Sequence, residues 1–214
     1  MATGRPREFD VDERLDRALT VFWRQGYEGT ALSDLTRAMG INRPSLYAAY
    51  GNKETLFRKA LDRYVEGPAS YVHTALTKPT AHAVAEALLF GAVEVVTRGP
   101  GGCLIVQAAL ATGEQNNAVR EEIASRRRAG ECDLAARFER ARAEGDLPPN
   151  IDCDALARYV WSISYGVSVQ AAGGASRDDL RKVVELALAL WPEQGAPDAG
   201  RPAAGQPTAS ASAR

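Results

Sequence analysis

Apolar side chains recur every three or four residues along most of the chain, which is the spacing of amphipathic helices. In the N-terminal part this pattern forms four segments, each bounded by a capping residue or a glycine. These predicted helices cover residues 10–26, 30–39, 42–50 and 52–64. Five more segments follow, at residues 81–97, 104–112, 117–144, 153–172 and 177–191. No run with strand alternation competes, so the pattern predicts an all-α protein.

The final stretch, residues 193–214, departs from this pattern. It is rich in Ala, Pro, Gly and Ser and has no Val, Ile, Leu, Met or aromatic residue. Such a segment cannot bury enough apolar surface to order itself. We therefore predict a disordered tail.

Two short helices joined by a tight turn are predicted between residues 30 and 50. Gly40 is the turn residue, because glycine tolerates the left-handed conformation that a tight turn often needs. Asn42 caps the next helix, and Pro44 falls in its first turn, where a missing N–H costs nothing. At ~100° per residue, Leu46 and Tyr50 share one side of this helix and can pack against the preceding helices.

The opposite side of the same helix is short and smooth. It carries Arg43, Pro44, Tyr47 and Ala48, with Ser45 at the edge. Small residues let a helix lie deep in the major groove of DNA, and an arginine can bind guanine edges in bidentate fashion. This pattern predicts a helix-turn-helix that reads DNA. The alternative is three ordinary helices with solvated cations.

The flanking residues fit contacts to DNA phosphates. Thr30 begins a helix, whose N-terminus attracts anions, and Tyr47 carries a hydroxyl donor. Lys53 begins the fourth helix, where a cation opposes the helix dipole and therefore suggests an outside anion. Arg5 and Arg7 precede the first helix and suit a backbone or minor-groove contact. The predicted DNA-binding residues are Arg5, Arg7, Thr30, Asn42, Arg43, Pro44, Ser45, Tyr47, Ala48 and Lys53.

The distribution of charge is compatible with DNA binding but does not by itself indicate it. The net charge is −1, but residues 1–60 hold ten Lys or Arg and eight Asp or Glu, which leaves room for a local basic face.

The chain has no apolar run of about 20 residues and no apolar segment after Arg5 and Arg7 that would indicate a secretory signal. Three scattered cysteines do not make a disulfide framework. We expect a cytoplasmic protein.

The N-terminal pattern resembles the TetR family of bacterial transcriptional regulators over about residues 8–60. The family usually has Phe where this chain has Tyr50. The matching residues are Ala18, Phe22, Gly26, Tyr27, Thr30, Leu35, Ala38, Gly40, Leu46, Tyr47, Tyr50, Lys53, Leu56 and Phe57.

The resemblance implies an N-terminal three-helix bundle with the helix-turn-helix, plus a six-helix C-terminal ligand-binding and dimerisation domain. We place the DNA-binding domain at residues 1–52, the second domain at 53–192 and the tail at 193–214. The resemblance also implies a homodimer on a palindromic DNA operator, usually a repressor, released by a small-molecule effector.

The last two predicted helices, 153–172 and 177–191, are the candidates for the dimer interface. The first has no charged residue after Arg158 and is apolar on nearly all sides, so it must be buried on most of them. Two such helices from each subunit would form a four-helix interface across a two-fold axis. The alternative is burial within one subunit.

Candidates for the effector site combine apolar walls with a few polar tips. Residues of this kind are more often ordinary core residues than ligand contacts. The predicted ligand-binding residues are Tyr71, Phe90, Cys103, Gln107, Phe138, Trp161 and Tyr165.

Cys103 has a second possible role as a thiol sensor of oxidants or electrophiles. It follows a glycine-rich segment, residues 99–102, and begins a helix, whose N-terminus stabilises a thiolate. The Gly-Cys-Leu segment also resembles a subgroup of the family that includes oxidant-responsive repressors. The alternative is a small buried apolar residue near a turn.

The sequence shows little sign of a metal site, a cofactor site or a catalytic site. His73 and His82 are the only histidines and lie off helical register, with no carboxylate or cysteine at ligand spacing, so we expect no metal site. No Gly-rich phosphate loop or nucleophile elbow is present, and we expect no cofactor. A small-molecule-modifying enzyme would need a convergent acid, base or nucleophile set, and none is visible. We therefore expect a transcriptional regulator and no enzyme.

Overall fold

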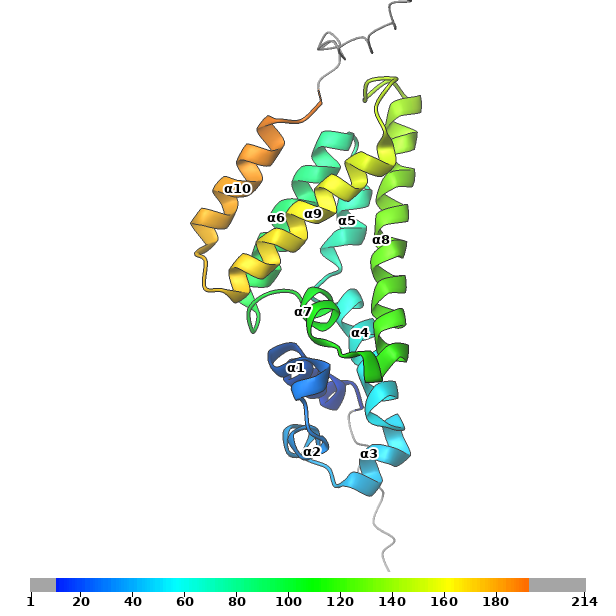
Figure 1. Ribbon diagram of the computed structural model, residues 1–214, viewed down its shortest axis with the longest axis vertical. Coiled ribbons are helices and arrows are strands. Elements are labelled where there is room, and N and C mark those ends of the chain that lie inside the picture. Colours follow the sequence, from blue (N-terminus) through cyan, green and yellow to red (C-terminus); the bar gives the residue numbers. More distant parts are fainter. Residues whose placement is uncertain (1–10, 193–214) are drawn as a thin grey trace, which may run out of the picture.

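The computed structural model describes residues 11–192, and within them it contains ten α-helices and one short 3-10 helix, with no strand (Figure 1). The prediction of an all-α protein is confirmed. The helices are α1 (Val11–Gly29), α2 (Leu32–Met39), α3 (Arg43–Tyr50), α4 (Lys53–Glu66), α5 (Tyr71–Leu76), α6 (Ala81–Arg98), α7 (Leu104–Ala111), η1 (Glu114–Asn116), α8 (Asn117–Ala143), α9 (Cys153–Ala172) and α10 (Arg177–Ala189). Predictions for Arg5, Arg7 and residues 193–214 lie outside the described residues.

Helices α1 to α3 form a small bundle at one end of the molecule's long axis (Figure 1). Gly26 interrupts α1 with φ 68° and ψ 177°, and a last helical stretch then runs to Gly29. Leu46 and Tyr50 of α3 are buried, as the pattern predicted. The Tyr50 hydroxyl also donates a hydrogen bond over 2.9 Å to the carbonyl oxygen of Val11, so α3 is fixed against the start of α1.

The core of this bundle continues into the rest of the molecule. Phe57 and Tyr64 of α4 belong to the same buried cluster as Phe22 of α1, and so do Leu104 of α7 and Ile123 of α8. Burying such side chains contributes on the order of 1.5–3 kcal/mol each. Helix α4 therefore shares one core with α1 to α3 and also with α7 and α8.

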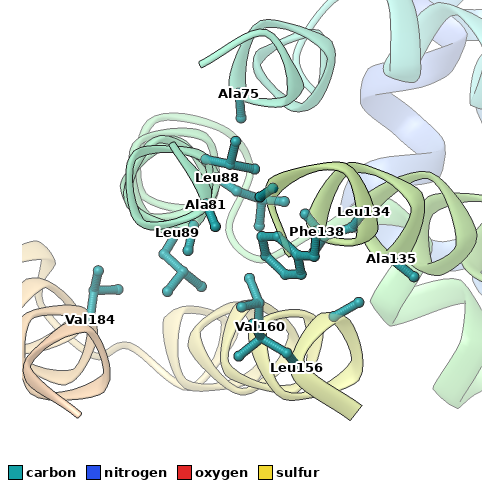
Figure 2. Close-up of a cluster of buried hydrophobic side chains, with 14 of the residues drawn as sticks. Ala75, Ala81, Leu88, Leu89, Leu134, Ala135, Phe138, Leu156, Val160 and Val184 are labelled. Carbon is teal, nitrogen blue, oxygen red and sulfur yellow. The ribbon is translucent and has the colours of Figure 1, made fainter. Parts of the chain in front are cut away.

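A second core joins α5, α6, α8, α9 and α10. Figure 2 shows Phe138 of α8 directed between α6 and α9, close to Leu88 and Val160. Its ring has no exposed surface. The apolar face of α8 uses this ring to fill the core, so the role of Phe138 as a ligand contact stays a prediction that its burial does not support.

Helix α5 was not predicted. It has only six residues, and its N-cap Ser70 makes no side-chain capping hydrogen bond, so neither length nor a cap marked it. Its position depends on a close contact with α6, because a Cβ at Gly91 would lie 2.3 Å from the Tyr71 ring. The glycine within α6 thus makes room for Tyr71. None of the described helices has the length and apolarity needed to cross a membrane.

Candidate nucleic-acid interface and ligand cavity

The turn between α2 and α3 is fixed by backbone geometry and two side chains. Gly40 adopts φ 64° and ψ 37°, the left-handed conformation that the sequence predicted. Its carbonyl oxygen accepts a hydrogen bond over 3.3 Å from Nη1 of Arg14 in α1. Asn42 caps α3, because its side-chain oxygen accepts a hydrogen bond over 2.9 Å from the Ser45 amide. These contacts set the angle at which α3 leaves the bundle.

The outer face of α3 is exposed and nearly neutral. Arg43, Pro44, Tyr47 and Ala48 are exposed, and Ser45 is half-buried. Tyr47 leaves 48% of its surface open, which is unusual for an aromatic residue of a small bundle. The face is free of acidic residues, so nothing on it repels a phosphate backbone.

Thr30 has a different role from the one expected. It is buried, and its hydroxyl donates a hydrogen bond over 2.6 Å to the Gly26 carbonyl oxygen. The N-cap of α2 is Ala31, whose amide donates to the Asp34 carboxylate over 3.3 Å. The prediction that Thr30 caps α2 is therefore wrong: its hydroxyl instead holds the kink of α1.

Lys53 lies at the first position of α4, as predicted, but it has contacts within the protein. Its ammonium nitrogen lies 4.5 Å from the centre of the Tyr27 ring, which attracts a cation electrostatically. Partial burial lowers the pKa of Lys53, while the nearby Glu28 carboxylate opposes that shift. The ring and Glu28 compensate part of the unfavourable position at the helix start, so that position alone does not require an outside anion.

A cavity of about 230 Å³ lies among α4, α5, α7, α8 and α9. Four of the predicted ligand-binding residues line it: Tyr71, Cys103, Trp161 and Tyr165. Surrounding protein raises the pKa of the Tyr71 hydroxyl, chiefly because burial disfavours the phenolate. The wall therefore presents the neutral Tyr71 hydroxyl on a mostly apolar surface that also includes the charged residues Arg126, Arg127 and Asp133.

Two other predicted residues lie elsewhere. The Phe90 ring is covered by the guanidinium of Arg181 in α10, 4.6 Å from the ring centre. Gln107 donates a hydrogen bond over 2.6 Å to the Gly101 carbonyl oxygen and so stabilises the loop before α7. Neither residue lines the cavity, so their roles as ligand contacts stay predictions that this cavity does not support.

Tyr64 of α4 connects the cavity to the DNA-reading bundle. Its hydroxyl donates a hydrogen bond to Sγ of Cys103, which begins α7, over 3.3 Å. Burial, followed by the nearby Cys103, raises the pKa of Tyr64 well above its ordinary value. The same ring meets Trp23 of α1 edge to face, with 4.9 Å between the ring centres. Tyr64 therefore contacts both Cys103 in the cavity wall and Trp23 of α1, so a displacement of Tyr64 would act directly on α1.

Several cavity residues were not predicted, notably Tyr64, Arg126 and Arg127. One signal in the sequence is the glycine within α8. A Cβ at Gly130 would lie 3.1 Å from the Trp161 ring, and the Gly130 carbonyl oxygen accepts the indole N–H over 3.0 Å. A glycine inside a helix marks such a close approach.

Within residues 11–192, no three His, Cys, Asp or Glu side chains gather in a group that could hold a metal ion. The two candidate sites are the exposed face of α3 and the small, mostly apolar cavity among α4, α5, α7, α8 and α9.

Comparison with known proteins identifies the family of the chain. The family model described as bacterial regulatory proteins, tetR family, matches residues 15–60, and a tetracyclin repressor-like C-terminal domain matches residues 83–187. The chain belongs to the TetR family of transcriptional regulators.

Three relatives match over almost their full length. The chain is 35% identical to the HTH-type transcriptional repressor ComR of Escherichia coli, over 89% of this chain and 92% of ComR. It is 42% identical to the TetR family regulator CifR, solved as a cysteine mutant with 26-bp operator DNA, with a TM-score of 0.83 over 88% of this chain and 100% of CifR. A putative TetR regulator from Rhodococcus sp. RHA1 is 46% identical, with a TM-score of 0.59 over 86% and 100% of the two chains.

Proposed function

We propose that the protein is a homodimeric repressor that binds a palindromic DNA operator and releases it when a small molecule enters the cavity. The observation that carries this proposal is the exposed face of α3, held by the Gly40 turn and the buried anchors Leu46 and Tyr50. Similarity to ComR, named a repressor, and to CifR, solved on operator DNA, supports it. Such a protein would act in the cytoplasm.

In this proposal Arg43, Pro44, Ser45 and Ala48 face the bases, and Asn42, Tyr47 and Lys53 hold the backbone. Thr30 contributes only indirectly, because its hydroxyl is occupied. The first main-chain amides of α2 remain suited to a phosphate, since a helix N-terminus leaves them without partners inside the helix. Residues up to 52, together with Lys53, would carry the DNA contacts, and the rest of residues 53–192 the effector and the dimer.

The dimer would form through α9 and α10. Both helices leave large apolar side chains open in the single chain: Tyr159 is 39%, Val169 49%, Leu186 65% and Leu190 71% exposed. Apolar groups gathered on adjacent helices mark a surface that another protein covers. A two-fold axis there would place the two copies of α3 on one face of DNA, with half-sites about 34 Å apart.

Release would pass through α4. This helix starts two residues after α3 ends and carries Tyr64, whose hydroxyl is in the cavity wall. A ligand that displaces Tyr64 would tilt α4 and change the spacing of the two copies of α3. Because both half-sites must fit at once, a small shift weakens both contacts together.

Gel shifts with the chain's own upstream DNA test the proposal. Arg43→Ala should keep the fold and relax base preference at the position that it reads, at about 1–3 kcal/mol of discrimination. Arg140→Ala is the matched control, since Arg140 is an exposed arginine near the end of α8, and it should bind as the wild type does. Unchanged base preference in Arg43→Ala would contradict the assignment of α3.

A second candidate is a repressor released by modification of Cys103. The observation that favours it is that Sγ lies at the cavity wall and accepts the Tyr64 hydrogen bond, so an adduct there would displace Tyr64. Cys132 is exposed and Cys153 buried, so the test uses Cys132→Ser as background. N-ethylmaleimide should release operator DNA in that background and not in Cys103→Ser/Cys132→Ser. Equal retention of DNA in both would exclude this mode.

A further inference from the structure

Arg127 is a cation in the cavity wall without a carboxylate partner. Its neighbour Arg126 is paired with Asp62 over 2.6 Å and with Glu122 over 2.7 Å. Among residues 11–192, no carboxylate makes an ion pair with Arg127, and its Nε is buried without a hydrogen-bond partner. Arg126 is thus paired with two carboxylates, whereas Arg127, the next residue in the sequence, is paired with none.

The guanidinium of Arg127 is held in place by an aromatic ring. Its central carbon lies 4.6 Å from the centre of the Tyr165 ring, and both residues line the cavity. Stacking on a ring fixes the plane of the fork, and a side-chain hydrogen bond between Arg127 and Tyr165 holds it further. The guanidinium holds its charge in a mostly apolar cavity wall with no carboxylate paired to it, so an anion in the cavity would be attracted more strongly than in water.

We propose that the effector is a small, mainly apolar molecule bearing an acidic group, and that its anion pairs with Arg127. A carboxylate matches the planar fork with two parallel hydrogen bonds, which a neutral amide cannot do. This inference rests on the proposed function, because it assigns the chemical class of the molecule that enters the same cavity.

The remaining wall fits the rest of such a molecule. The cavity of about 230 Å³ has the liquid volume of about eight waters, which limits the ligand to a small one. Val72, Ile105 and Trp161 supply apolar surface. Asp133 is the carboxylate in the wall, and it is exposed to solvent, where water and salt screen its repulsion of an anion.

Calorimetric titration of the full chain with benzoate and with benzamide tests the inference, because the two probes share shape and differ in charge. Benzoate should bind wild type at least tenfold more tightly than benzamide. Arg127→Gln should lower benzoate affinity to that of benzamide. Arg128→Gln, the exposed neighbouring position, should keep the wild-type preference. Arg127→Lys, which keeps the charge and loses the fork, should fall between wild type and Arg127→Gln.

Equal affinity for the two probes, no binding of benzoate, or an unchanged preference in Arg127→Gln would each overturn the inference. The wild-type comparison does not depend on the folding of any variant. Operator binding without probe is measured in parallel on the wild type. Its loss would contradict the proposed function, whereas intact operator binding with no preference for benzoate would contradict only the acidic effector.

Discussion

The indole N–H of Trp23 in α1 donates a hydrogen bond over 2.9 Å to the carbonyl oxygen of Gly102, the residue before Cys103. The contact joins two positions 79 residues apart in the sequence. The same ring fills the space beside Gly99, where a Cβ would lie 2.8 Å from it. Helix α1 of the DNA-reading bundle is thereby tied to the loop that begins the cavity wall, independently of α4.

Trp23→Phe should destabilise the protein, because it leaves the buried Gly102 carbonyl without its donor while keeping an aromatic ring. We expect the free energy of unfolding to fall by about 1–3 kcal/mol, the cost of an unsatisfied buried group. Urea unfolding followed by circular dichroism measures it. An unchanged midpoint and slope would mean that the hydrogen bond contributes nothing to the link.

Lys53→Ala should weaken binding to all DNA sequences by a similar factor. If each subunit of a dimer loses one phosphate contact, the slope of log affinity against log salt should become shallower by about 1.8. Lys78→Ala removes the same charge from an exposed position after α5, outside the proposed DNA and dimer surfaces, and serves as the control. Equal slopes for Lys53→Ala and wild type would show that Lys53 only stacks on Tyr27.

The ion pair between Asp16 of α1 and Arg63 of α4 should make stability depend on acid pH. Nε and Nη2 of Arg63 donate to the two carboxylate oxygens over 2.7 and 3.0 Å, and this hydrogen bonding lowers the pKa of Asp16 below its ordinary value of 3.8. A lowered pKa means that the stabilisation is complete above the unfolded value and is lost as pH falls through the folded one.

Asp16→Asn should therefore be less stable than wild type at pH 7, and the difference should shrink below about pH 4. Urea midpoints at pH 7, 5 and 3 measure it. Arg63→Gln should show the same pH dependence, and the double variant should add little to either single one. A stability difference that is constant from pH 7 to pH 3 would contradict the ion pair as its cause.

Leu190→Glu, at the C-cap of α10, should convert a dimer to monomers. Leu190 is 71% exposed in the single chain, and a carboxylate buried there in a dimer would lack a partner, at about 3–5 kcal/mol. Light scattering at micromolar concentration measures the mass. Val11→Glu, at an apolar residue of α1 that is 51% exposed, should leave the mass unchanged. A wild-type monomer would contradict the dimer itself.

Local chemistry in the sequence was enough to predict the helix-turn-helix. Gly40, Asn42 and Asn52 act within three or four residues of their own position, so the turn and both caps could be read from spacing alone. Five helices after residue 80 were likewise located to within two residues at each end. The short helix α5 had no such signal, because its contact with Gly91 lies about twenty residues away.

The sequence by itself determined the helical class, the reading helix and the side of that helix that faces outward, since these follow from helical period and caps. Only the tertiary structure decided which aromatic residues share a cavity. Tyr71, Trp161 and Tyr165 meet there, whereas Phe138 packs in the core. The physical reason is that periodicity records whether a side chain is buried, while its neighbours depend on how distant helices cross.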